Sequence, residues 1–280
     1  MIEKILSILL DEDKAKGIHY LFRYRKHVDF LKTIYTNFKY FPISDALKFP
    51  IVIGKNTDIK LGSIKFNCPI KPSLVRLGTQ PIPVIEDGFS RLVVKNSGTI
   101  EIGGLFICQT GVKILIREGA VFSVADKVKF GHLSKVVCHK KISIGNDFRM
   151  SWECQIFDTD FHFVYNTEKN KYYPRLKPVI IGNDVFVGNR STIGKGTILP
   201  NGSIVSCNSN VSGDFSINGD NILIKGNPAV FVKNNLIMGS NPTEWGLVDN
   251  GKVFVKNNLI MGSNSFYPEK EEIVAQMLNE

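Results

Sequence analysis

The sequence predicts a mainly β fold in which short strands wind into a solenoid behind a helical N-terminal segment. Three observations support this: a strict six-residue period over residues 181–216, looser versions of it from residue 51, and helical apolar spacing confined to about residues 1–40. The chain has 280 residues, of which 43% are hydrophobic, so it can bury a substantial core.

The six-residue period is clearest in six consecutive hexads. Their first position is always aliphatic, their second is glycine, proline or serine, and their fifth is mostly small. A period of six matches neither a helix nor simple strand alternation, but it fits coils in which every sixth side chain points inward. The stacked coils then form an aliphatic column. The first positions are Ile181, Val187, Ile193, Leu199, Val205 and Val211, and the fifth are Val185, Ser191, Thr197, Ser203, Ser209 and Phe215.

We expect three parts along the chain. A helical segment covers residues 1–42, the solenoid domain covers 43–230 with an inserted loop at 162–178, and a β-rich and helical appendage covers 231–280. The appendage carries a tandem duplication, because VFVKNNLIMGSN occurs at 230–241 and again at 253–264. Between the copies, DNG predicts a hairpin, and a short helix is expected near 268–279. Capping the solenoid is the role we expect for this appendage.

Composition narrows the class of protein. The five cysteines form no CxxC pair, no apolar run is long enough to span a membrane, and no signal peptide is recognisable, which favours a cytoplasmic protein. The net charge of +9 either serves solubility or attracts an anionic partner. No nucleic-acid-binding motif accompanies it, so nucleic acid is not expected. The basic N-terminal helices are expected to pack on their own domain; the alternative is peripheral contact with the inner membrane.

The stretch IFDTDFHFVY, residues 156–165, places Asp158, Asp160 and His162 among apolar residues. Residues two apart on an extended segment share a face, so the three side chains can point the same way. Taken alone, this pattern also fits a solvated loop.

The hexads, the run KPVIIGNDVFVG at 177–188 and GNPA at 226–229 resemble the hexapeptide-repeat acyltransferases, and most closely their galactoside, maltose and polysaccharide O-acetyltransferase branch. The resemblance is specific over about residues 141–233. It implies a left-handed parallel β-helix and a homotrimer that binds acetyl-CoA between neighbouring subunits. It also implies that His162 is the general base, because the family places a histidine at this point, before a loop that leads into the next coils. Asp160 or Asp158 would then orient its imidazole.

Acetyl transfer to a hydroxyl needs such a base, which contributes about 10²–10⁴-fold in rate. For acetyl-CoA, the resemblance implies contacts from Gly188, Asn189, Cys207, Ser212, Lys225, Pro228 and Lys233. One departure affects the phosphate contacts: Val230 stands where the family commonly has a basic residue. No metal is expected, because the H-x4-H pair of hexapeptide-repeat carbonic anhydrases is missing.

The loop at 163–178 is aromatic and basic, which suits a saccharide acceptor that carries negative charge, although a solvated loop remains the alternative. The candidate acceptor contacts are Tyr165, Tyr172, Tyr173, Arg175, His132 and Ser134. The predicted function is O-acetylation of a bacterial surface polysaccharide, either capsule or lipopolysaccharide. The alternatives are N-acetylation of a nucleotide-linked amino sugar and a non-catalytic β-solenoid that binds glycans or acts as a scaffold.

Overall fold

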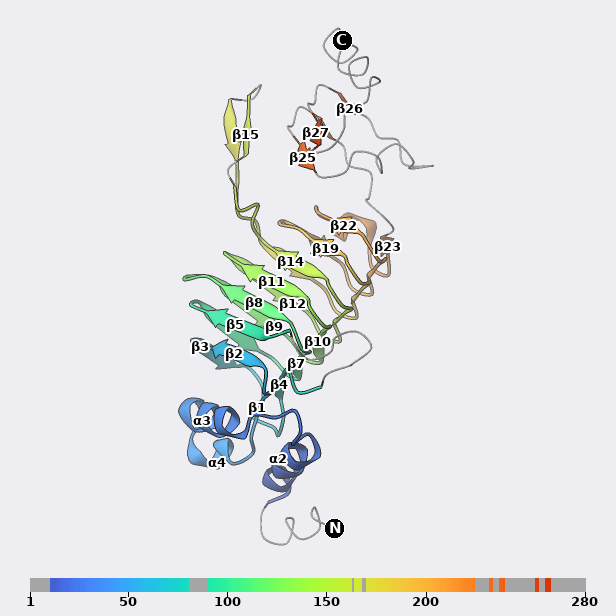
Figure 1. Cartoon of the computed structure of the whole chain (residues 1–280). Helices are drawn as coiled ribbons and strands as arrows, with labels where there is room; N and C mark the ends of the chain where they lie inside the picture. The colour runs from blue at the N-terminus through green and yellow to red at the C-terminus, as the bar shows by residue number, and fades with distance from the viewer. Residues whose placement is uncertain are drawn as a thin grey trace. The chain divides into compact units, whose positions relative to one another are not determined.

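Three parallel sheets of stacked strands build most of the protein, with a few short helices at one end (Figure 1). The computed structural model describes residues 11–80, 90–162, 164–167 and 170–224, and four short strands at 232–233, 237–239, 255–256 and 260–262. The predicted mainly β, parallel β-helix is confirmed.

Successive strands visit the three sheets in turn, so that neighbours within a sheet come from consecutive coils. The first sheet contains β1 (Ile51–Ile53), β4 (Val75–Leu77), β7 (Phe106–Cys108), β10 (Val128–Phe130), β13 (Arg149–Met150), β18 (Phe186–Val187), β21 (Ile204–Val205) and β23 (Leu223–Ile224). The second contains β2 (Thr57–Lys60), β5 (Leu92–Asn96), β8 (Lys113–Ile116), β11 (Lys135–Cys138), β14 (Gln155–Phe157), β19 (Thr192–Ile193) and β22 (Asn210–Val211). The third contains β3 (Ser63–Phe66), β6 (Thr99–Ile102), β9 (Val121–Val124), β12 (Lys141–Ile144), β17 (Val179–Ile181) and β20 (Ile198–Leu199).

The hexad positions fill the interior as predicted. All six first-position residues are buried, and so are the fifth-position residues from Val185 to Ser209. The fifth-position hydroxyls also satisfy carbonyl groups at the turns: Ser191 donates to the Ser206 oxygen at 2.8 Å, and Thr197 donates to the Gly194 oxygen at 2.6 Å. A small hydroxyl residue therefore closes the corner and pairs a buried backbone group.

The turns also stack in columns, which we name by the sheets they connect: the first corner leads from the first sheet to the second, the second corner to the third sheet, and the third corner back to the first. At the third corner, Asn or Asp side chains accept hydrogen bonds from backbone N–H groups of the preceding coil at 2.8–3.1 Å. The accepting side chains are Asp126, Asn146, Asn183, Asn201 and Asp220.

In the described part of the chain, three helices lie next to the first coil: α2 (Glu12–Arg23), α3 (Phe30–Tyr40) and α4 (Ile43–Ala46). Asp11 and Asp29 cap the first two through bonds from backbone N–H groups at 3.0 Å. Helix α2 packs on its own domain through Leu21, which is buried with Val28 and Val52. Helix α3 also packs on its own domain, but through the polar residues Thr33, Thr36 and Asn37. None of the described helices is long and apolar enough to cross a membrane.

The duplicated segments pair with each other. Strands β24 (Val232–Lys233) and β25 (Ile237–Gly239) align with β26 (Val255–Lys256) and β27 (Ile260–Gly262), at the offset of the duplication. Both pairings are parallel. The hairpin turn predicted at DNG, residues 249–251, is not among the residues that the structure describes. The helix expected near 268–279 lies outside the described residues. The solenoid to Phe161 and from Leu176 forms one compact unit, and His162–Arg175 groups with β24–β27 in a second.

Candidate functional site

The loop that carries His162 leaves the solenoid at the second corner, between β14 and β17. Its two ends are held together, because Thr159 forms a bridge with Leu176 and the Lys177 N–H donates to the Asp158 carbonyl at 3.1 Å. Phe161, at the exit, adopts a positive φ of 63°. This corner fixes the place on the coil stack where the loop departs and returns.

Asp158 is buried, and its carboxylate binds the neighbouring coil. One oxygen accepts the His139 N–H at 2.7 Å, and the other accepts the Lys140 and Lys141 N–H groups, each at 2.7 Å. The Cys138 thiol lies 3.7 Å from the second oxygen. Burial, with the Asp158 charge, raises the pKa of this thiol to about 12. Asp158 thus holds the backbone of the preceding turn in place.

The other two residues of the predicted catalytic group differ in exposure, since Asp160 is half-buried and His162 is exposed. Asp160 forms an ion pair with Lys195, which follows β19 at the same second corner. His162 is exposed and is the first residue of the second unit. Beside the exit, the ring of Phe161 lies 5.8 Å from the rings of both His139 and Phe157. The role predicted for either aspartate in orienting His162 stays a prediction.

The inserted loop forms an antiparallel hairpin of β15 (Val164–Asn166) and β16 (Lys171–Tyr173). Tyr165 pairs with Tyr172 in its register, and the Asn166 amide donates to the Tyr173 hydroxyl at 3.2 Å. Tyr172 is exposed, whereas Tyr173 and Arg175 are half-buried. The Tyr172 ring is therefore presented to solvent.

The predicted acetyl-CoA residues divide between two corners. Gly188, Asn189 and Cys207 lie together at the first corner, where the Asn208 N–H donates to the Asn189 carbonyl at 2.9 Å. A Cβ on Gly188 would lie 2.6 Å from the Cys207 nitrogen, so glycine is required for the coils to stack there. Ser212 follows β22 and lies at the second corner. The second sheet therefore separates it from the other three.

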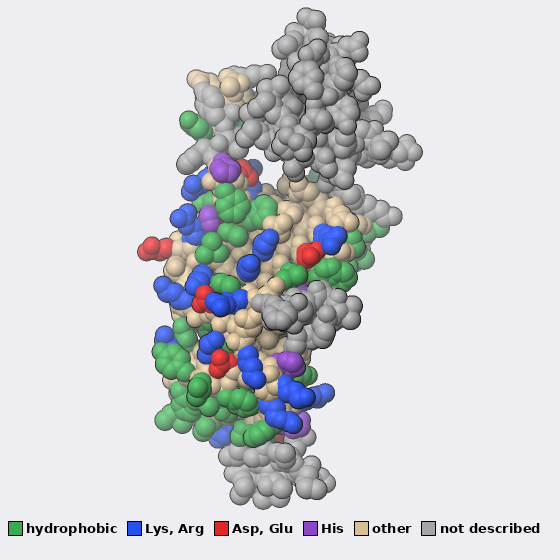
Figure 2. Space-filling model, viewed as in Figure 1, with side chains coloured by type: hydrophobic (Ala, Val, Ile, Leu, Met, Phe, Trp, Pro, Cys, Tyr) green, Lys and Arg blue, Asp and Glu red, His purple; other side chains and the backbone are tan. Residues whose placement is uncertain are grey.

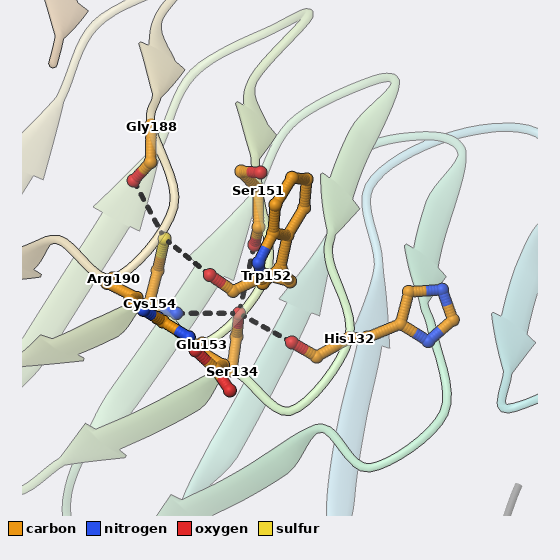
Figure 3. A network of polar contacts seen from close by, with 8 residues as sticks. All are labelled: His132, Ser134, Ser151, Trp152, Glu153, Cys154, Gly188 and Arg190. Atoms are coloured by element: carbon orange, nitrogen blue, oxygen red, sulfur yellow. Dashed lines mark hydrogen bonds and ion pairs between the residues drawn. The ribbon is translucent and has the colours of Figure 1, made fainter. Parts of the chain in front are cut away.

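A polar network below these residues joins consecutive turns of the first corner (Figure 3). The Cys154 thiol donates to the Gly188 carbonyl at 3.1 Å, and the Cys154 N–H donates to the Ser134 hydroxyl at 3.2 Å. Arg190 and Glu153 pair at 2.6 Å on the surface of the same turns. This network was not predicted from the sequence. Aligning SWEC with GNRS and SCNS would have placed Cys154 in the small buried position held by Ser191 and Ser209.

His132 and Ser134 belong to this buried layer. The Nδ1 atom of His132 lies 2.8 Å from the Thr110 hydroxyl oxygen, and Ser134 donates to the Ser151 carbonyl at 3.1 Å. Both side chains have less than 2% of their surface exposed. A saccharide cannot reach them, so the acceptor contacts predicted for these two residues are wrong. Their polar groups instead serve the packing of the coils.

The structure describes little of the three remaining residues that were predicted to bind acetyl-CoA. Lys225 and Pro228 lie outside the described residues, and Lys233 appears as a backbone position of β24, paired with Lys256. Within the described part of the chain, no three His, Cys, Asp or Glu side chains gather as they would around a metal ion.

No model of a known protein family matches the sequence, and no curated protein matches it. Two solved structures are similar to the chain. One is the polySia-specific acetyltransferase NeuO, with 17% identity, 68% of this chain and 90% of that chain covered, and a TM-score of 0.33. The other is the polysialic acid O-acetyltransferase OatWY, with 23% identity, coverage of 70% and 95%, and the same TM-score of 0.33.

Proposed function

We propose that this chain is an O-acetyltransferase that moves acetyl from acetyl-CoA to a sugar hydroxyl of a bacterial surface polysaccharide. The observation that carries the proposal is the position of His162, exposed at the start of a loop that is pinned to one corner of a β-helix. A solvent-accessible imidazole suits proton transfer, because histidine is the side chain that most often serves as a general base near neutral pH. The proposal is also supported by the hexads and the GNPA motif, through which the sequence resembles the hexapeptide-repeat acyltransferases.

In this proposal, His162 first accepts and then returns the proton that is transferred during the reaction. Its imidazole takes the proton of the sugar hydroxyl as the oxygen attacks the thioester carbonyl, and a tetrahedral oxyanion forms. This intermediate collapses, the carbon–sulfur bond breaks, and the coenzyme A thiolate takes the proton from the imidazolium. Asp160, or Asp158, orients the imidazole in this proposal, as in other carboxylate–histidine pairs.

Acetyl-CoA binds along the corners in this proposal. Gly188, Asn189 and Cys207 line the thioester and the arm at the first corner, Ser212 contributes at the second, and Lys225 and Lys233 with Pro228 hold the nucleotide end. Because the second sheet separates the two corners of one chain, a homotrimer would bring the first corner of one subunit to the second corner of its neighbour. The exposed Tyr172 ring and Arg175 would contact an acidic saccharide.

The decisive experiment compares His162→Ala with His27→Ala, which changes an exposed histidine in the turn between α2 and α3. We expect His162→Ala to abolish acetyl transfer to capsular oligosaccharides while its melting temperature and assembly mass match those of wild type. His27→Ala should leave turnover unchanged. Turnover close to wild type in His162→Ala would refute the mechanism.

Two further measurements separate the alternatives. Hydroxyl and amino acceptors assayed in parallel distinguish O-acetylation from N-acetylation of a nucleotide-linked amino sugar. Calorimetry with acetyl-CoA distinguishes both from a non-catalytic solenoid, since a scaffold has no reason to bind it. The absence of binding at millimolar acetyl-CoA would favour the scaffold.

A further inference from the structure

Helix α3 has an inverted polarity: its polar face is buried and its apolar face is exposed. The polar face of α3 packs against β1, the strand at the edge of the first sheet, and forms hydrogen bonds with its backbone. Asn37 donates to the Ile51 carbonyl at 2.7 Å and accepts the Ile51 N–H at 3.0 Å, and Thr33 accepts the Ile53 N–H at 3.1 Å. These side chains replace the strand that would otherwise continue the sheet. The apolar face has therefore been turned away from the solenoid.

The exposed residues follow one stripe of the helix. Leu31, Ile34, Tyr35 and Phe38 stand at i, i+3, i+4 and i+7, and they are 82%, 42%, 68% and 44% exposed. Scattered exposed apolar residues are ordinary, but a continuous helical stripe of them marks an interaction surface. We call these four residues the α3 stripe.

Basic side chains lie on α3 and in the loop before it. Lys39 lies on α3 with its ammonium 5.8 Å from the centre of the Tyr35 ring, and Arg25 and Lys26 project from the loop before the helix. Figure 2 shows hydrophobic side chains gathered at this end of the chain with lysines and arginines beside them. Among the described residues, no carboxylate pairs with Arg25, Lys26 or Lys39.

A basic cavity opens next to the stripe. It has a volume of about 520 Å³, and its lining includes Tyr35 together with Lys32, Lys55 and Arg91. The acidic residue of its lining, Asp58, already pairs with Lys95 at 2.9 Å. Lys32 pairs with Asp29 at 3.4 Å, so Lys55 and Arg91 supply the positive charge that remains. Such a cavity fits a phosphate group.

We propose that the α3 stripe docks this end of the protein on an anionic lipid surface. The apolar side chains enter the boundary between headgroups and acyl chains, Tyr35 sits at the headgroup level, and the surrounding cations attract lipid phosphates. The charge argues for lipid over a second copy of the chain, because two copies would bring the same uncompensated cations face to face. The proposal does not depend on the acetyl-transfer activity.

The test is sedimentation of the full chain with vesicles of phosphatidylcholine alone and of phosphatidylcholine with phosphatidylglycerol. We expect binding to the anionic vesicles, weakened by salt. Leu31→Glu should weaken vesicle binding about tenfold or more, because the variant lacks the leucine side chain that would insert into the bilayer. Ile217→Glu is the matched control, since Ile217 is 85% exposed at the other end of the solenoid.

The contribution of charge is tested with Lys26→Glu/Lys39→Glu, which should weaken binding by about fivefold or more per lysine. Lys113→Glu/Lys135→Glu, on the outer face of the second sheet, changes the net charge equally and should have little effect. The proposal is overturned if wild type ignores anionic vesicles, or if the control variants lose as much binding as the stripe variants. A fall in assembly mass for Leu31→Glu, without vesicle binding by wild type, would assign the stripe to contacts between copies.

Discussion

Asn37 forms two hydrogen bonds with the backbone of Ile51, one to its carbonyl oxygen at 2.7 Å and one from its N–H at 3.0 Å. A side-chain amide presents a donor and an acceptor side by side, as a strand does, so it can close the edge of the first sheet. An open edge would leave these backbone groups unpaired and free to bind another strand.

Replacing Asn37 with alanine should therefore lower the stability of the whole chain. The change leaves a buried N–H and a buried carbonyl without partners, which costs about 2–4 kcal/mol in total. Urea unfolding measures it. Asn67→Ala, at an exposed position, should stay within about 0.5 kcal/mol of wild type. Equal stability of the two variants would show that water replaces the amide.

The solenoid could be predicted from its sequence because its core repeats at a fixed spacing. Val187, Ile193 and Leu199 are buried at three consecutive sheets, as their hexad positions require. The face through which α3 packs on the solenoid could not be predicted. Helical spacing identifies the apolar face, but it does not show that the polar face must pair with the backbone groups of β1. Here the bonds from Thr33 and Asn37 to β1 decide the orientation.

The site was predictable only where the coil register determines it. His162 and Asp160 follow the last coil before the inserted loop, and Gly188 and Cys207 stack because they are one coil apart. The burial of His132 and Ser134 was missed, because polar residues suggest a surface when their register is unknown. Aligned with the later coils, Ser134 stands in the same small, buried position as Ser191.

Asp158→Asn tests the structural role of that carboxylate. An amide offers one accepting oxygen where the carboxylate offers two, and its NH₂ group would face the N–H donors of residues 139–141. We expect a loss of about 2–4 kcal/mol in the free energy of unfolding. Amide hydrogen exchange at Lys140 and Lys141 should also become faster. Asp184→Asn, an exposed control, should change neither. Lost activity with unchanged stability and exchange would instead assign Asp158 to the chemistry.

The thiols of Cys138 and Cys154 should make stability fall at alkaline pH. Burial raises their pKa values to about 12 and about 11, above the value of about 8.5 for an unfolded thiol. A group with a raised folded pKa stabilises the protein fully below its unfolded pKa, and this contribution is lost as the pH rises through the folded value. Denaturant unfolding from pH 8 to pH 11 should therefore show a steeper decline for wild type than for Cys154→Ala. Cys207→Ala, at an exposed position, should follow wild type; parallel curves for all three proteins would contradict the assignment.

Two hexad glycines should respond differently to the same substitution. A Cβ at Gly188 would lie 2.6 Å from the Cys207 nitrogen of the next coil, whereas at Gly194 its nearest neighbour is Ser212 Cβ at 3.5 Å. Neither glycine has a positive φ, so the comparison isolates the space between coils. Gly188→Ala should lose about 1–3 kcal/mol because the stacked backbones must separate. Gly194→Ala should be neutral or gain up to about 1 kcal/mol, because alanine restricts the unfolded chain. Thermal and urea unfolding compare the pair, and an equal loss in both variants would show that the hexad glycine is needed for its conformation and not for close stacking.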